Sequence, residues 1–125
     1  MAEAEMTDNG PTEPPGRLSV VSTTVDGIRV VTPAGELDHH TGDTLRQALD
    51  ASDTPRPRVV VDLHQVTFMD SSGINILIAA HRALSEADGW LRLAAPRESV
   101  MRTLNIVGVD TLIDCRETLH QALSN

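Results

Sequence analysis

The feature that most constrains the fold of this sequence is a short, mainly apolar run, Val59–Leu63, which is followed after one loop by a long apolar helical pattern. A run that does not alternate with polar residues is typical of a strand buried on both faces, as in a parallel sheet. The helical pattern begins at Ile74 and predicts a largely buried helix to about Asp88. Its apolar stripe consists of Ile74, Leu77, Ile78 and Leu84, widened by Ile76, Ala79, Ala80 and Ala83.

The segment before this unit predicts a β-hairpin. Two stretches rich in β-branched residues, Leu18–Thr24 and Ile28–Thr32, flank an Asp-Gly pair, which is a strong short-range hairpin signal. Pairing across this turn places one set of side chains on one face: Val21, Thr23, Val25, Ile28, Val30 and Thr32. We expect the second strand to end near Pro33, because proline cannot donate a hydrogen bond to a sheet.

Helical and strand patterns alternate along the rest of the chain. The predicted elements are a short helix capped by Asp38 or Thr41 and ending near Ala51, a strand at Trp90–Ala94, a helix from Pro96 to before Gly108, a weak strand at Thr111–Asp114 and a helix at Glu117–Leu123. This order predicts a single α/β domain with a mostly parallel sheet, an N-terminal antiparallel hairpin and about four helices.

Composition narrows the classes of function. The net charge of −8 disfavours nucleic acid and anionic membranes as partners. All ten basic residues are arginine, so the chain lacks the lysine of a P-loop, of a Schiff base or of a response-regulator receiver domain. Cys115 is the only cysteine, and no apolar run approaches the roughly 20 residues of a membrane span. A reducing cytoplasm is the expected compartment.

Residues 1–16 differ in composition from the rest of the chain. They contain four acidic residues, no basic residue and few apolar side chains, and they end in Pro14-Pro15-Gly16. Such a segment cannot bury enough apolar surface to order itself. We therefore expect a disordered acidic, proline-containing tail over residues 1–16 and a folded domain over residues 17–125.

The most informative polar stretch is Phe68-Met69-Asp70-Ser71-Ser72-Gly73, which lies where a loop becomes the long helix. The first N–H groups of a helix have no partner within it, and the positive end of its dipole lies there. Ser71 is a suitable N-cap, and Gly73 allows a close approach to the backbone. An oxyanion at this point would meet free donors. We interpret Ser71 as a reversible phosphorylation site, with Ser72 as the second choice, at a helix end that docks a protein.

Other polar residues do not indicate a catalytic or metal centre. His39 and His40 are adjacent, so they do not share a helix face, and no third ligand is clustered with them. His81 lies on the apolar side of its predicted helix, where we expect a satisfied core or edge residue. Ser71 lacks the Gly-x-Ser-x-Gly context of a hydrolase nucleophile. We therefore expect neither an enzyme nor a cofactor or metal site.

Two motifs carry a family resemblance. The segments Gly35-Glu36-Leu37-Asp38-His39-His40-Thr41 and Phe68–Gly73 resemble the signature stretches of STAS-domain anti-sigma factor antagonists. The strand Val59–Leu63 and the segment 101–108 also fit the family pattern, so the resemblance covers about residues 17–123. The serine loop is the most specific part, whereas the Gly-Glu-Leu-Asp part alone would be weak. The acidic tail and Pro33 depart from the pattern.

The resemblance implies a regulatory binding protein. Unphosphorylated, such a protein binds an anti-sigma factor that is also a serine kinase, and so releases a sigma factor for transcription. Ser71 follows the acid directly and would accept the phosphate, which breaks the complex; a PP2C-type phosphatase would reverse this step. Asp38 and Asp70 would lie beside Ser71, and Ser72 and Gly73 would form the docked helix end. The free protein is expected to be a monomer.

Three other classes of function stay open on the residues alone. A receiver-like phosphotransfer domain would have a similar architecture, but the absence of lysine argues against it. A STAS module that senses a ligand or scaffolds a larger complex is the main alternative. A small hydrolase would require turnover by the isolated chain that depends on Ser71.

Overall fold

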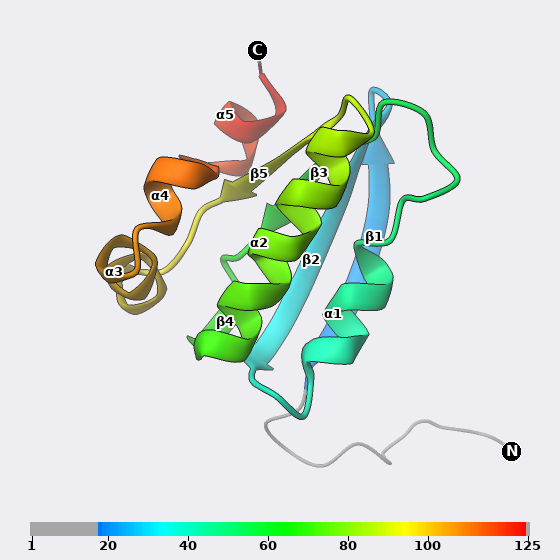
Figure 1. Cartoon of the computed structure of the whole chain (residues 1–125). Helices are drawn as coiled ribbons and strands as arrows, with labels where there is room; N and C mark the ends of the chain where they lie inside the picture. Colours follow the sequence, from blue (N-terminus) through cyan, green and yellow to red (C-terminus); the bar gives the residue numbers. More distant parts are fainter. Residues whose placement is uncertain (1–17, 125) are drawn as a thin grey trace, which may run out of the picture.

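The computed structural model describes residues 18–124, which form a mixed β-sheet flanked by helices (Figure 1). The strands are β1 (Ser19–Val25), β2 (Ile28–Leu37), β3 (Arg58–Asp62), β4 (Val66–Met69), β5 (Trp90–Ala94) and β6 (Asp114–Arg116). They lie in the order β1-β2-β3-β5-β6, and β4 pairs with the end of β2. Only the β1–β2 pair is antiparallel among these strands, which confirms the predicted α/β class. The predicted tail, residues 1–16, lies outside the described residues.

Five helices accompany the sheet in the described part of the chain. They are α1 (Gly42–Ala48), α2 (Ser71–Glu86), α3 (Glu98–Ile106), α4 (Val109–Leu112) and α5 (Leu119–Leu123). Helices α1 and α2 lie side by side over one face of the sheet (Figure 1), above the main core of Leu, Val and Ile side chains. Helix α5 covers part of the other face, where Ala122 packs with Ile28 and Val60. No helix of residues 18–124 has both the length and the apolar character needed to cross a membrane.

Strand β2 is longer than predicted. The hairpin register is confirmed, with Val25 opposite Ile28 and Val21 opposite Thr32, but β2 continues through Pro33 to Leu37. The prediction that β2 ends near Pro33 is therefore wrong. On the side away from β1, β2 pairs with β3 at residues 29–31 and with β4 at residues 35–37. Pro33 falls between these two ladders, where its missing N–H interrupts neither of them.

Two short elements were missed or misplaced by the sequence patterns. Strand β4 has only four residues, buried at Val66 and Met69 and exposed at the two between, so it shows no period-2 alternation. The segment predicted as a weak strand from Thr111 begins instead as the one-turn helix α4, and β6 starts at Asp114. Gly108 adopts a left-handed conformation, with φ of 79°, which ends α3 and turns the chain into α4.

Helix α2 is also less buried than predicted. Ala79 and Ala83 are exposed and Ile76 and Ile78 are half-buried, because one side of the helix faces solvent. His81 is half-buried, and its Nδ1 atom is buried without a hydrogen-bond partner among the described residues. The expectation of a satisfied histidine is therefore wrong for that atom.

Candidate functional site

The two signature loops meet because β2 and β4 end at the same edge of the sheet. In this parallel pair Leu37 is in register with Met69, so the residues that follow them, Asp38 and Asp70, begin neighbouring loops. A backbone hydrogen bond of 3.1 Å from the Asp70 N–H to the Leu37 carbonyl joins the loops directly. Carboxyl ends of parallel strands meet in this way in many α/β sites. The structure thus brings Asp38 and the Asp70–Gly73 segment together.

Asp70, rather than Ser71, is the N-cap of α2. The Asp70 side chain accepts hydrogen bonds from the N–H groups of Ser72, at 2.9 Å, and Gly73, at 3.4 Å. Ser71 is the first helical residue and is exposed. The prediction that Ser71 caps the helix is wrong, because a carboxylate at the preceding position takes that role. The Ser71 hydroxyl is therefore not used for capping.

The same carboxylate changes the prediction about anion binding. Two of the first N–H groups of α2, those of Ser72 and Gly73, already donate to Asp70, and the N–H of Ile74 donates to the Asp70 carbonyl. An anion on Ser71 would meet these three N–H groups already engaged, two of them by a fixed negative charge. The expectation that it would find free donors is therefore wrong for these three N–H groups.

The Asp38 loop is held by a compact set of hydrogen bonds. The Asp38 side chain accepts from the N–H groups of His40, at 2.9 Å, and Thr41, at 3.1 Å. The buried Thr41 hydroxyl donates to the Glu36 carbonyl at 2.7 Å and accepts from the Asp38 N–H at 3.0 Å. Partial desolvation raises the pKa of Asp38, but the hydrogen bonds from His40 and Thr41 outweigh it and hold that pKa below its usual value. Asp38 is thus a fixed, ionised group.

Thr41 is the residue of this loop that sequence reasoning undervalued. It was predicted only as a possible helix cap, and it does occupy the N-cap position of α1, although its side chain makes no capping bond. Its hydroxyl instead locks the chain between β2 and α1. The Asp-x-x-Thr spacing is the signal that would have indicated such a local side-chain-to-backbone motif.

Close packing at two glycines fixes the helices against the loops. A Cβ atom at Gly73 would lie 3.1 Å from the Leu37 Cβ and 3.0 Å from the Met69 Cγ. A Cβ atom at Gly42 would lie 2.5 Å from the Ile76 Cδ1. The first contact holds the start of α2 on the end of β2, whereas the second places the start of α1 against the flexible end of a side chain on α2. Gly73 therefore allows the start of α2 to approach Leu37 and Met69 closely.

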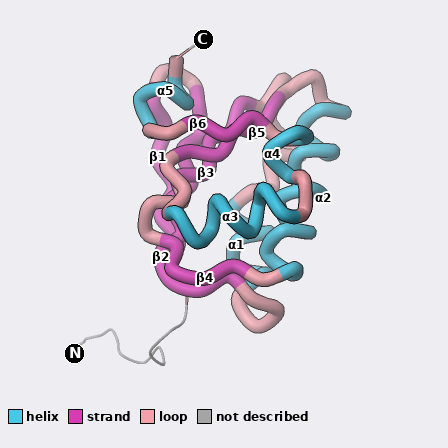
Figure 2. Tube along the Cα trace, turned by 90° about the vertical axis from the view of Figure 1, so that its left-hand side faces the viewer, coloured by secondary structure: helices cyan, strands magenta, loops and turns pink. Residues whose placement is uncertain are grey.

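The surface beside Ser71 also contains an exposed aromatic side chain. Phe68 on β4 is 48% exposed, whereas its neighbour Met69 is buried. Helix α3 lies across β4 (Figure 2), and β4 leads through Asp70 into α2. Ser72 is half-buried and Gly73 is buried, so Ser71 is the accessible member of the Ser71–Gly73 triplet. The loop presents one hydroxyl and one aromatic ring to solvent.

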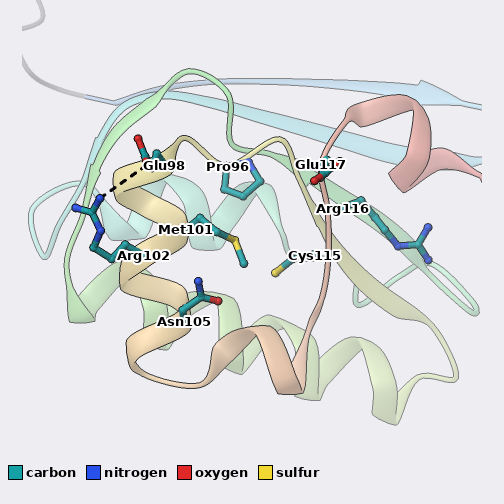
Figure 3. A pocket seen from close by; sticks show the side chains of 8 residues that line it. All are labelled: Pro96, Glu98, Met101, Arg102, Asn105, Cys115, Arg116 and Glu117. Atoms are coloured by element: carbon teal, nitrogen blue, oxygen red, sulfur yellow. Dashed lines mark ion pairs between the residues drawn. The ribbon is translucent and has the colours of Figure 1, made fainter.

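A second cavity lies away from this loop, between α3 and β6. It has a volume of about 700 Å³ and is drawn in Figure 3, where Met101 and Cys115 face it and the Arg116 side chain points away. Burial, together with the charges of Asp110 and Asp114, raises the pKa of the Cys115 thiol to about 11. Within residues 18–124, no three metal-binding side chains are grouped closely enough to hold an ion. These features do not make Cys115 a nucleophile at neutral pH.

The comparisons with known proteins agree with this fold. An anti-sigma F factor antagonist of Paenibacillus polymyxa is 31% identical over 85 residues, which is 66% of this chain and 73% of that protein. An anti-sigma-B factor antagonist of Staphylococcus aureus is 29% identical over 101 residues, 80% of this chain and 94% of that protein. The crystal structure of an anti-sigma factor antagonist from Mycobacterium paratuberculosis superposes with a TM-score of 0.79 at 31% identity, covering 88% of this chain and 94% of the other. The family model described as the STAS domain matches residues 19–122, and this chain therefore belongs to the STAS domain family.

Proposed function

We propose that this protein is an anti-sigma factor antagonist whose binding to an anti-sigma factor is switched off by phosphorylation of Ser71. The relatives named above are anti-sigma factor antagonists, and two of them are covered over more than 90% of their length by this chain. The observation that carries the proposal is the position of Ser71: an exposed first residue of α2 whose capping role has been taken over by Asp70.

The loop suits a serine that is modified by another protein. A kinase needs an exposed hydroxyl in a presentable backbone, and it supplies the nucleotide, the metal ion and the base itself. Ser71 offers the hydroxyl, and the bonds between Asp70, Leu37 and the start of α2 fix the backbone. Under this proposal the chain is a kinase substrate and a binding partner, and it catalyses no reaction itself. A serine/threonine phosphatase of the PP2C type removes the phosphate.

Electrostatics explain why the modification opposes docking. A phosphate adds about −1.5 to −2 charges at neutral pH. It would stand one residue from the Asp70 carboxylate, which already occupies the N–H groups of Ser72 and Gly73. In an interface, the phosphate must also lose its water without gaining a matched cation, which costs several kcal/mol. Because about 1.4 kcal/mol changes affinity tenfold, a loss of two to three orders of magnitude requires no large change of shape.

Phe68 and Asp38 extend the proposed docking surface around Ser71. Phe68 supplies an exposed aromatic ring of the kind that often anchors protein interfaces. Asp38 supplies a fixed negative charge in the adjacent loop. The partner is expected to present an apolar pocket for Phe68 and a neutral hydrogen-bond donor for Asp38, with a kinase active site that reaches Ser71.

The first experiment identifies the partner and the modified residue together. Co-purification of the tagged protein from its native cells should recover a kinase-like anti-sigma factor, and phosphosite mapping should find Ser71 modified. Ser72→Ala is the matched control, because Ser72 is half-buried and adjacent in sequence. Modification of Ser72 in place of Ser71 would contradict the assignment of the acceptor.

The second experiment tests the switch with the recovered partner. Ser71→Ala should bind the anti-sigma factor as tightly as the unmodified protein, and Ser71→Asp should bind substantially more weakly. Titration calorimetry measures both affinities, and far-UV circular dichroism checks that both variants fold. Equal affinity of the two variants would refute a switch that acts through charge at Ser71.

A further inference from the structure

A cavity distinct from the one between α3 and β6 lies at the end of the sheet opposite Ser71, and its lining is rich in arginine. It has a volume of about 300 Å³ and lies between the β1–β2 turn, the segment before β3 and the end of α1. Figure 1 shows this turn and this segment at one end of the sheet and the start of α2 at the other. Strand β2, with ten residues, spans the two ends, so about 30 Å separates them. Three of the ten basic residues of the chain, Arg29, Arg56 and Arg58, line this cavity.

We propose that Arg29, Arg56 and Arg58 form a binding site for the phosphate group of a small metabolite. No acidic side chain belongs to the lining, although the protein as a whole carries a net charge of −8. Guanidinium groups match phosphate oxygens with paired N–H donors, and several of them near one cavity favour a multiply charged oxyanion. Arg29 is in register with Val59, so the Arg29 and Arg58 side chains leave the sheet on opposite faces and flank the cavity at its end from two sides. The volume lies at the lower end of the range for ligand pockets, which suits a phosphate or diphosphate group rather than a large molecule.

Two of the three arginines are held in place by backbone carbonyls rather than by carboxylates. The Arg29 Nη1 donates to the Asp50 carbonyl at 2.9 Å and to the Ala48 carbonyl at 3.4 Å. The Arg58 Nη2 donates to the Asp26 carbonyl at 3.2 Å. Each guanidinium has five N–H donors, so most of them stay available after these bonds. Among the described residues, the ion pairs between an arginine and a carboxylate involve other arginines than these three.

The third arginine sits on a strained and rigid segment. Arg56 has φ of 48°, a left-handed conformation that costs energy for a residue with a side chain, and it lies between Pro55 and Pro57. The Pro57 carbonyl accepts the N–H of Trp90 at 2.9 Å, which ties the segment to β5. Strain that the surrounding structure maintains is typical of functional sites, and here it fixes the position from which Arg56 lines the cavity.

The charge that competes most directly with a ligand is that of Asp50. Its carboxylate accepts from the Ser52 N–H at 3.0 Å, and this bond, assisted by the charge of Arg29, lowers the pKa of Asp50. Asp50 is therefore ionised near the cavity. Among the described residues, its carboxylate forms no ion pair with the Arg29 guanidinium within 4 Å. Binding therefore requires the charges of the three lining arginines to outweigh this carboxylate.

The protein contains a single tryptophan at the right place to report binding. Trp90 is the register partner of Arg58 in the β3–β5 pair, and the chain has no tyrosine. Titration with pyrophosphate at low salt should change Trp90 emission in a saturable way, and two-dimensional NMR should show shifts confined to the cavity residues. Inorganic phosphate should bind more weakly because it carries less charge, and succinate should bind most weakly if phosphate is the preferred group.

Matched variants distinguish binding at this cavity from non-specific attraction of anions to positive charge. Arg56→Gln and Arg58→Gln should each weaken pyrophosphate binding about 10- to 100-fold, since each removes charge-assisted hydrogen bonds. Arg82→Gln, an exposed arginine on α2, removes the same charge elsewhere and should change affinity less than twofold. Circular dichroism and the unfolding midpoint check that each variant folds.

Three outcomes would overturn the proposal. These are a linear response that does not saturate, an equal loss in Arg82→Gln, or succinate binding as tight as pyrophosphate. The test is independent of the proposed function, because Ser71→Ala should bind pyrophosphate like the unmodified protein, and loss of partner binding leaves this site intact.

Discussion

Gly73→Ala tests the close packing that joins the two signature loops. The added Cβ would lie 3.0–3.4 Å from Met69 Cγ, Leu37 Cβ and the Leu37 carbonyl oxygen. Leu37 is fully buried, and its carbonyl is held by the Asp70 N–H, so neither group can retreat without moving a strand end. Overpacking of this kind costs about 1–3 kcal/mol. Replacing glycine by alanine in a helix stabilises by about 0.5–1 kcal/mol. The net expectation is a loss of about 1 kcal/mol.

The assay is urea unfolding followed by circular dichroism and by Trp90 fluorescence. A loss of about 1 kcal/mol corresponds to a decrease in melting temperature of roughly 4 °C for a domain of this size. Gly42→Ala is the matched control, because its Cβ would meet only the terminal carbons of the half-buried Ile76 side chain, which can rotate. We expect its stability to change by less than about 0.5 kcal/mol.

Gly73→Ala is expected to lower the free energy of unfolding. A Gly73→Ala protein that is more stable than the unmodified one would show that helix propensity outweighs the contacts with Leu37, and the reasoning would be refuted. An equal loss in Gly42→Ala would show that rigid and flexible neighbours make no difference. If Gly73→Ala folds but loses partner binding while Gly42→Ala retains it, the close approach also matters for docking.

Three further predictions follow from the hydrogen bonds and pKa shifts. Thr41→Val should destabilise by about 1–3 kcal/mol, because it leaves buried backbone groups of Glu36 and Asp38 without partners, whereas Thr41→Ser should retain most of the stability in urea unfolding. The lowered pKa of Asp38 stabilises the fold at pH values above the usual pKa of 3.8, and this contribution is lost as pH falls through the folded-state pKa. In an acid titration, Asp38→Asn should therefore lose stability less steeply below about pH 4 than the unmodified protein. Because burial raises the pKa of Cys115 to about 11, iodoacetamide at pH 7.5 should modify the native thiol far more slowly than the thiol in urea, and equal rates would contradict the burial.

The larger elements of the fold follow from sequence patterns that tertiary contacts do not override. The Asp-Gly turn, the apolar run at Val59 and the helix beyond Ile74 each have a period or turn signal strong enough to locate them. Pro33 does not end β2, because proline disrupts a strand only where its N–H would join a ladder, and here the ladder changes partner at that point. Strand β4 was missed because four residues are too few to establish a period.

The candidate site could be located from the sequence, but its internal roles could not be assigned. Asp70 and Ser71 are both good N-caps, and a shift of one residue in the start of α2 decides which of them is capped and which is exposed. That decision depends on the register of Met69 with Leu37, a contact between strands that are 32 residues apart in the chain. The arginine cavity was not predicted, because Arg29 is distant in sequence from Arg56 and Arg58.

Because β2 continues past Pro33, the number of its residues fixes the distance between its two ends. Its side chains alternate between the faces of the sheet. Its first half pairs with β3 and its second half pairs with β4. Inserting one residue at position 33 would leave the half paired with β3 in place but would turn every side chain of the other half to the opposite face. Leu37 would leave the core, and Asp38 would no longer start beside Asp70. Insertion of two residues preserves the faces but displaces the loop by about 7 Å, so the spacing between Arg29 and Asp38 has little tolerance for length variation.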